Sequence, residues 1–303
     1  MWIANRQDYR VFRSGRFVGY VHKRFASADY CDILVDLLVS PPSSVKALHR
    51  RYLNREVFAI NVLMNGCPQE MFLKSVRFKS YWHLIFIDPF MPSVTLRYLA
   101  LAETLKAIGI HTPSIIAVVE EKSLLGTKRS FVLTEWIPNA LTLKDIIVAP
   151  SRPCSGSELA GRRAIIHSLA EMVRRLHSNK IFHFDLKLLN ILLRGERAGA
   201  HSLTLVDLDD AVILPAKAGM LSNLLRFADL LILNEYFFPV THLKERLRFL
   251  TAYSGKTLSM RRYRRILFFL VSTPALLHVY RCLDAIRFIP LLRRVLICLR
   301  IVR

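Results

Sequence analysis

The chain has 303 residues, of which 52% are apolar and 22% are charged, and its formal net charge is +21 at pH 7. This apolar content excludes an intrinsically disordered protein, and the absence of a fixed-period repeat excludes a solenoid. A charge so far from zero predicts an acidic partner, which could be nucleic acid, anionic lipid or a phosphorylated glycan.

The first 45 residues contain short strand-like runs and one apolar helix. Strands are predicted at Tyr9–Phe12 and Phe17–Tyr20, and a helix at Tyr30–Val39. The first residues contain no apolar run of the kind found in secretory signal peptides, so we expect no signal peptide. The five cysteines are scattered without a C-x-x-C pair, which indicates a reducing compartment. We assign residues 1–45 to an N-terminal extension of unknown role.

The next segment predicts a hairpin followed by a helix. Two runs rich in β-formers, Glu56–Met64 and Glu70–Val76, flank the turn-prone pair Asn65-Gly66. Residues 93–108 have helical periodicity, and the glycine that follows them, Gly109, is typical of the position just after a helix end.

The character of the chain changes about halfway along. Strands are predicted at Ile115–Glu120 and Ser130–Glu135, whereas Leu159–His177 predicts a long amphipathic helix and most of the later chain is helical. A β-rich lobe over residues 46–137 and a mainly helical lobe over residues 138–260 give an α+β fold class with two lobes.

The strongest chemical signal is the stretch His183–Asn190, which reads H-x-D-x-K-x-x-N and is followed by Asp207. Asp185 can accept a hydroxyl proton, and Asn190 and Asp207 supply the hard oxygen ligands that suit Mg²⁺ carrying nucleotide phosphates. Lys187 can stabilise negative charge on a transferring phosphoryl group. Together these residues are the chemical minimum for kinase-type phosphoryl transfer, so we predict Asp185 and Lys187 as catalytic and Asn190 and Asp207 as metal ligands.

The nucleotide half of the predicted site is less complete. Lys74 ends the second hairpin strand amid apolar residues, where a lysine ahead of a helix would contact the α- and β-phosphates of ATP. Lys79, five residues later, is the alternative candidate for this contact with the phosphates. The following helix offers only Glu103 as the acidic partner of this lysine, and Tyr98 stands where the glutamate is expected. No G-x-G-x-x-G precedes the hairpin.

The C-terminal segment, residues 261–303, carries ten arginines, no lysine and one acid, Asp284. Bulky apolar residues alternate with the arginines, as in Ile286–Leu296, which predicts an amphipathic helix lying on an anionic membrane. An ordinary helical subdomain with a solvated arginine face is the alternative. Aromatic residues do not alternate with the basic ones, so no nucleic acid is expected. The longest apolar run, Ile266–Tyr280, is shorter than the roughly 20 residues of a spanning helix, so we expect no transmembrane segment.

These motifs resemble the bacterial lipopolysaccharide kinase family, the Kdo and heptose kinases of the inner core, within the protein-kinase-like superfamily. The resemblance covers about residues 55–255. Besides the catalytic stretch, the segments that fit the family pattern are Phe72-Leu73-Lys74, Gly109–Pro113, Ser130–Glu135, Leu176-His177, Leu205–Asp209, Arg226–Leu230 and Arg246–Tyr253.

The resemblance implies a cytoplasmic enzyme, peripheral on the inner face of the inner membrane. It would use ATP and Mg²⁺ to phosphorylate a Kdo or heptose hydroxyl, with the lipid A-core glycolipid and the anionic membrane surface as partners. It also implies that Asp229 braces the catalytic loop and that the backbone of Glu135 to Ile137 contacts adenine.

Two alternatives stay open. A protein kinase or small-molecule phosphotransferase of the same superfamily is one, but only about twenty residues separate Asp207 from Arg226 and contain no A-P-E element. The basic tail argues against a freely soluble acceptor. The other alternative is a membrane-associated pseudokinase, which Tyr98 and the missing glycine loop favour and the intact Asp185 opposes.

Overall fold

The structure is a computed structural model, and it describes residues 6–39, 55–64, 67–77, 94–124, 126–148, 156–194, 202–216, 219–237, 241–255 and 275. The predicted turn at Asn65-Gly66, the competitor Lys79 and nearly all of the arginine-rich segment lie outside these residues. The chain divides into two compact units. Unit 1 includes Met1–Thr104 and Pro113–Pro138, and unit 2 includes Leu105–Thr112 and Asn139–Arg300.

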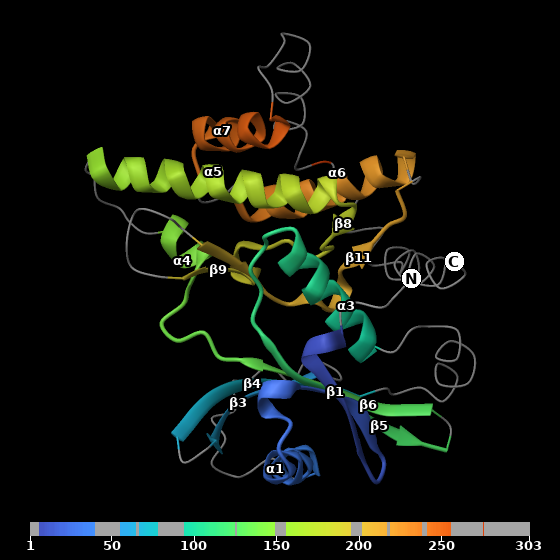
Figure 1. The fold of residues 1–303 in the computed structure, drawn as a ribbon. Coiled ribbons are helices and arrows are strands. Elements are labelled where there is room, and N and C mark those ends of the chain that lie inside the picture. The colour runs from blue at the N-terminus through green and yellow to red at the C-terminus, as the bar shows by residue number, and fades with distance from the viewer. Residues whose placement is uncertain are drawn as a thin grey trace. The chain divides into compact units, whose positions relative to one another are not determined.

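Unit 1 is built on a six-stranded sheet in which every neighbouring pair is antiparallel (Figure 1). The strand order is β1-β2-β5-β6-β4-β3. Its strands are β1 (Tyr9–Ser14), β2 (Phe17–His22), β3 (Arg55–Met64), β4 (Cys67–Arg77), β5 (Ile115–Ser123) and β6 (Gly126–Glu135), and its helices are α1 (Ala28–Val39) and most of α3 (Val94–Ala107).

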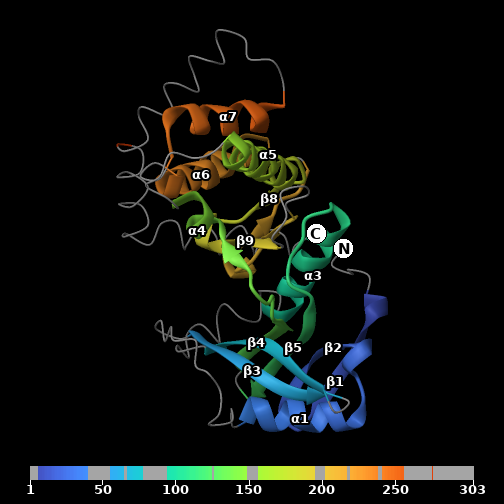
Figure 2. The same cartoon turned by 90° about the vertical axis from the view of Figure 1, so that its left-hand side faces the viewer.

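One face of this sheet is closed by α1, which runs beneath the strands in Figure 2. Leu34 and Leu38 of α1 are buried in one cluster with Met71 and Leu73 of β4, because alternate residues of a strand point to the same face. Residues 1–45, which the sequence sets apart as an extension, therefore contribute two strands and one helix to unit 1.

The end of α3 shows why glycine follows it. Gly109 has φ +71°, a left-handed conformation that glycine adopts without a steric cost. Its N–H donates to Lys106 O at 3.0 Å, and Ile110 N–H donates to Leu105 O at 2.9 Å, which is the Schellman pattern of helix termination. Directly after it, His111 forms a parallel bridge with Thr204 of unit 2.

Unit 2 is mainly helical with short strands. Its long helix α5 packs against α7 and against β8 (Figure 1). Its elements are β7 (Leu141–Thr142), α4 (Leu143–Val148), α5 (Gly156–Ser178), β8 (Ile181–Phe182), β9 (Ile191–Arg194), β10 (Ser202–Leu205), β11 (Val212–Ile213), α6 (Gly219–Phe237) and α7 (Leu243–Ser254). A sheet-rich unit followed by a helical one confirms the predicted α+β class. Within the described ranges, no helix combines the length and apolar character needed to cross a membrane.

Candidate active site

A hairpin in unit 2 places the two predicted metal ligands at the same end. Strands β9 and β10 are antiparallel with Ile191 opposite Leu205, so the residues just outside that pair are Asn190 and Val206. Val206 N–H donates to Asn190 O at 3.0 Å, and Asp207 follows directly. The backbone pairing alone therefore brings Asn190 and Asp207 next to each other.

The predicted base, Asp185, is bound on both sides by residues of its own loop. The amide nitrogen Nδ2 of Asn190 donates to Asp185 O at 2.8 Å and to Asp185 Oδ2 at 3.1 Å. Lys187 Nζ lies 2.6 Å from Asp185 Oδ1, and both side chains are partly exposed. Since the nitrogen of the Asn190 amide is committed to Asp185, its Oδ1 is the atom with which it can hold a cation.

The donor set at this position fits a hard cation. Asn190 offers an amide oxygen and Asp207 a carboxylate, and Mg²⁺ is bound through one or two such groups together with water and phosphate oxygens. In the part of the chain that the structure describes, no three His, Cys, Asp or Glu side chains gather as a metal cluster.

Asp229 of α6 binds the backbone of the catalytic loop. Its carboxylate is fully buried and accepts hydrogen bonds from the backbone N–H of His183 and of Phe184, both at 2.8 Å. Charged acceptors make the strongest hydrogen bonds of this type, and their loss in a buried place is costly. The bracing role that the family resemblance implies for Asp229 is confirmed.

Asp229 is contacted by His177, which in turn contacts Tyr253, and the sequence does not reveal this second contact. His177, buried in α5, lies 3.2 Å through Nε2 from Asp229 Oδ2 and 2.7 Å through Nδ1 from the Tyr253 hydroxyl of α7. Burial raises the pKa of Tyr253 to about 12, so its hydroxyl stays protonated. His177 belongs to the segment Leu176-His177, which fits the family pattern, but nothing in the sequence shows that Tyr253 is its partner.

Two residues of the loop region have a strained backbone. Phe184 and Asp207 both have φ +61°, a left-handed conformation that is rare outside glycine and collects at functional sites. His183, buried beside them, contacts Val206 O through Nε2 at 3.1 Å. The His183 ring therefore connects the loop to the end of the hairpin.

In unit 1, Lys74 lies on the sheet face opposite α1. It pairs with Val132 in β6, which in turn pairs with Val118 in β5, and cross-strand partners point to the same face. Glu120, two residues after Val118, accepts a hydrogen bond from the Thr95 hydroxyl of α3 at 3.1 Å. Lys74 and the start of α3 therefore share one face of the sheet.

Lys74 and Glu103, the pair that the sequence predicts, both belong to unit 1. The ion pairs described for unit 1 include none between these two side chains, and Lys74 has other contacts there. Glu103 instead acts on Tyr9, whose pKa is raised mainly by burial and further by the charge of this carboxylate. Tyr98 stands where the glutamate is expected, and the pairing of Lys74 with an acid stays a prediction.

The predicted adenine-contacting segment follows the last strand of the sheet. Glu135 N–H donates to Ser114 O at 3.0 Å, and Trp136 N–H donates to Glu70 O at 3.3 Å. The Trp136 ring stacks on Phe72 of β4 with ring centroids 6.5 Å apart. Ile137 is buried immediately before the end of unit 1 at Pro138.

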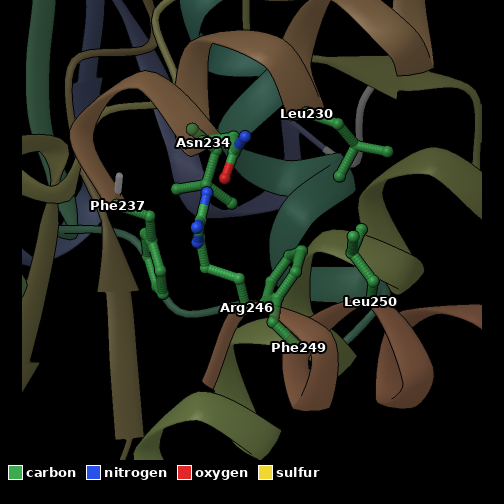
Figure 3. Close-up of a pocket in the computed structure, with 7 residues that line it drawn as sticks. Leu230, Asn234, Phe237, Arg246, Phe249 and Leu250 are labelled. Atoms are coloured by element: carbon green, nitrogen blue, oxygen red, sulfur yellow. The ribbon is translucent and has the colours of Figure 1, made fainter. Parts of the chain in front are cut away.

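A small cavity lies elsewhere in unit 2, between α6 and α7 (Figure 3). Its volume of about 10 Å³ is room for a single water molecule, so it cannot take a nucleotide or a sugar. The Arg246 side chain extends into it toward Asn234, and burial lowers the pKa of this arginine. The cavity is a packing feature of the two helices.

Comparison with known proteins agrees with the predicted family and fold class. The family model described as lipopolysaccharide kinase (Kdo/WaaP) matches residues 66–225, which is more than half of the chain. A solved structure described as WaaP in complex with acyl carrier protein has 20% sequence identity and a TM-score of 0.56, over 79% of this chain and 87% of that one. At this identity the likeness shows the fold. No curated protein matches the sequence.

Proposed function

This chain belongs to the lipopolysaccharide kinase (Kdo/WaaP) family, and from that premise we propose that it transfers the γ-phosphoryl group of ATP to a hydroxyl of Kdo or heptose in the lipopolysaccharide core. The family makes it a phosphotransferase with a sugar alcohol as acceptor. The observation that carries the proposal is the contact of both Asn190 and Lys187 with Asp185.

Asp185 would act on the acceptor. Its carboxylate would orient the sugar hydroxyl in line with the γ-phosphorus and take the hydroxyl proton as the new oxygen–phosphorus bond forms and the bond to ADP breaks. Lys187, 2.6 Å from Asp185 Oδ1, would place a positive charge beside the transferring group. The bonds from Asn190 fix the carboxylate, so little reorganisation is needed during the reaction.

Asn190 and Asp207 would hold Mg²⁺, which when bound neutralises charge on the phosphate oxygens. Lys74 would contact the α- and β-phosphates, and the backbone from Glu135 to Ile137 would contact adenine.

The acceptor sits in a membrane, and we propose that the protein acts on the inner face of the inner membrane. The arginine-rich residues 261–303 support this setting, because basic and apolar side chains together favour an anionic lipid surface. A protein kinase is less well supported, since the segment after Asp207 has no A-P-E element.

The test is phosphate transfer from ATP to purified lipid A-core that carries Kdo or heptose, with the product identified by its added phosphate in mass spectrometry. Asp185→Asn should lower kcat by about 10²- to 10⁴-fold while the Kd for ATP stays the same. The matched control is Asp145→Asn, which changes an exposed carboxylate of α4. A fall of less than about threefold for Asp185→Asn would remove it as the base. Nucleotide binding without any turnover would favour the pseudokinase alternative.

A further inference from the structure

One end of the unit 1 sheet is formed by two neighbouring turns. Ser14 pairs with Phe17 across the β1–β2 turn, and Ser123 pairs with Gly126 across the β5–β6 turn. The two turns are adjacent because β2 and β5 are neighbours, and Lys122 N–H donates to Arg16 O at 2.8 Å. In Figure 1, β5 and β6 run out together to this end.

The turn between β5 and β6 presents a leucine to solvent. Leu124 has a relative exposure of 105%, so its side chain touches almost nothing of the protein. A single exposed apolar residue is common on protein surfaces and carries no meaning alone. What distinguishes Leu124 is the set of charges around it.

Five basic residues lie on the strand ends next to these two turns. Three of them, Arg16, Lys122 and Lys128, have side chains 52%, 44% and 61% exposed. The whole group, which with Leu124 we name the basic tip, consists of Arg13, Arg16, Lys122, Lys128 and Arg129. The two acids at this end of the strands, Glu120 and Glu121, are both buried and offset two of the five charges, which leaves a formal excess of three positive charges at this end of the sheet.

The cations of the basic tip are held in place. Glu121 lies 3.1 Å from Arg16 Nε and 3.7 Å from Lys128 Nζ, and it also accepts a hydrogen bond from Arg129. Burial opposes ionisation of this carboxyl, but the Arg129 hydrogen bond and the three positive charges bring its pKa below the usual value. The guanidinium of Arg16 also lies over the Phe17 ring, 5.5 Å from the centroid. The tip therefore presents charge at a fixed position.

We propose that the basic tip docks on an anionic phospholipid bilayer and inserts Leu124 among the lipids. This inference rests on the proposed function, which requires access to a membrane-embedded acceptor. A bilayer offers anionic headgroups and an apolar layer within one side-chain length, which is the combination that the tip complements. Nucleic acid fits less well, because the aromatic rings here, Phe17 and Phe131, are buried and cannot stack on bases.

The experiment is flotation of the full chain with vesicles of phosphatidylcholine, with or without phosphatidylglycerol. Each basic side chain near an anionic surface contributes roughly fivefold to the partition coefficient. Leu124→Ser with Lys128→Gln should therefore weaken binding to the anionic vesicles by more than about tenfold, and binding to pure phosphatidylcholine should stay low. Leu141→Ser with Lys144→Gln, an exposed pair in unit 2, is the matched control and should bind like the unchanged chain.

Several outcomes would overturn the proposal. One is that the Leu124→Ser and Lys128→Gln variant binds the anionic vesicles as well as the unchanged chain does. The same result is expected if the partner of the basic tip is an acidic protein. Displacement from the vesicles by soluble glycerol phosphate, at constant ionic strength, would indicate a site for free phosphate instead of a bilayer surface. Turnover on a deacylated, water-soluble core sugar separates this proposal from the proposed function. If the unchanged chain phosphorylates neither this sugar nor lipid A-core, the kinase assignment fails, whereas the vesicle result stands by itself.

Discussion

The catalytic loop of unit 2 and strand β4 of unit 1, which carries Lys74, differ in the contacts described for their candidate site residues. In the loop, Asp229 binds two backbone N–H groups at 2.8 Å, and Asp185 is bound by Asn190 and Lys187. In unit 1, by contrast, no described ion pair joins Lys74 to Glu103. The comparison teaches that the candidate catalytic residues of unit 2 are positioned by contacts within that unit, whereas the pairing of Lys74 with an acid stays a prediction. Changes in the loop should therefore act on kcat.

The largest effect is expected for Asp229→Asn. This change places an amide among backbone donors in a fully buried position, so the loop loses a charged acceptor that no water can replace. We expect the free energy of unfolding to fall by about 3 kcal/mol and kcat by at least about tenfold. Urea unfolding and steady-state kinetics measure both. If kcat and stability both stay at the unchanged level, the bracing interpretation fails.

The next effect concerns Glu121, which anchors three cations in unit 1. Its pKa is lowered in the folded state, so its stabilisation is present above its unfolded pKa and is lost as pH falls through the folded value. Glu121→Gln should lower the free energy of unfolding by about 2 kcal/mol at pH 7, and the deficit should shrink below about pH 4. Urea titrations across this range provide the measurement. A deficit that does not depend on pH would contradict the assigned ionisation.

A smaller effect is expected for Tyr253→Phe, which removes the hydroxyl that contacts His177 at 2.7 Å. One neutral hydrogen bond is worth about 1 kcal/mol, so stability should fall by about that amount and kcat by a few-fold. The matched control is Tyr30→Phe in α1, because the buried Tyr30 hydroxyl has no hydrogen-bond partner among the described residues. Equal losses from the two variants would mean that Tyr253 does not support the loop.

The smallest effect is expected for Glu103→Gln. Because this carboxylate acts on Tyr9 and makes no described ion pair with Lys74, the KM for ATP should change by less than about twofold. Lys74→Met is the positive control and should weaken ATP binding by at least about tenfold. If Glu103→Gln raises KM as much as Lys74→Met does, the two side chains pair when the nucleotide is bound.

Local patterns in the sequence were enough to predict most of the elements and the catalytic stretch. The six strands of the unit 1 sheet, α3 with its terminal Gly109 and the long helix α5 follow from periodicity and turn residues, and they are present close to the predicted bounds. The H-x-D-x-K-x-x-N stretch located the loop, because its chemistry depends on residues that are close together in the chain. The hydrogen bonds from Asn190 to Asp185 span only five residues.

Long-range relations could not be predicted in this way. Strand β2 pairs with β5, about a hundred residues later, and no local pattern encodes a partner so distant, which is why residues 1–45 were set apart as an extension. The contact of His177 with Tyr253 crosses 76 positions. Glu103 is the one acid of its predicted helix, which is why the sequence points to it, but its proximity to Tyr9 and the face on which its carboxylate lies depend on long-range packing.

The left-handed backbone of Asp207 restricts which substitutions can be interpreted at the metal position. At φ +61°, aspartate and asparagine are tolerated far better than alanine or glutamate, since their short polar side chains suit this conformation. A change to alanine or glutamate would disturb the chain path together with the ligand. Asparagine keeps the shape and removes only the charge, so it is the one replacement by which cation affinity can be measured apart from folding.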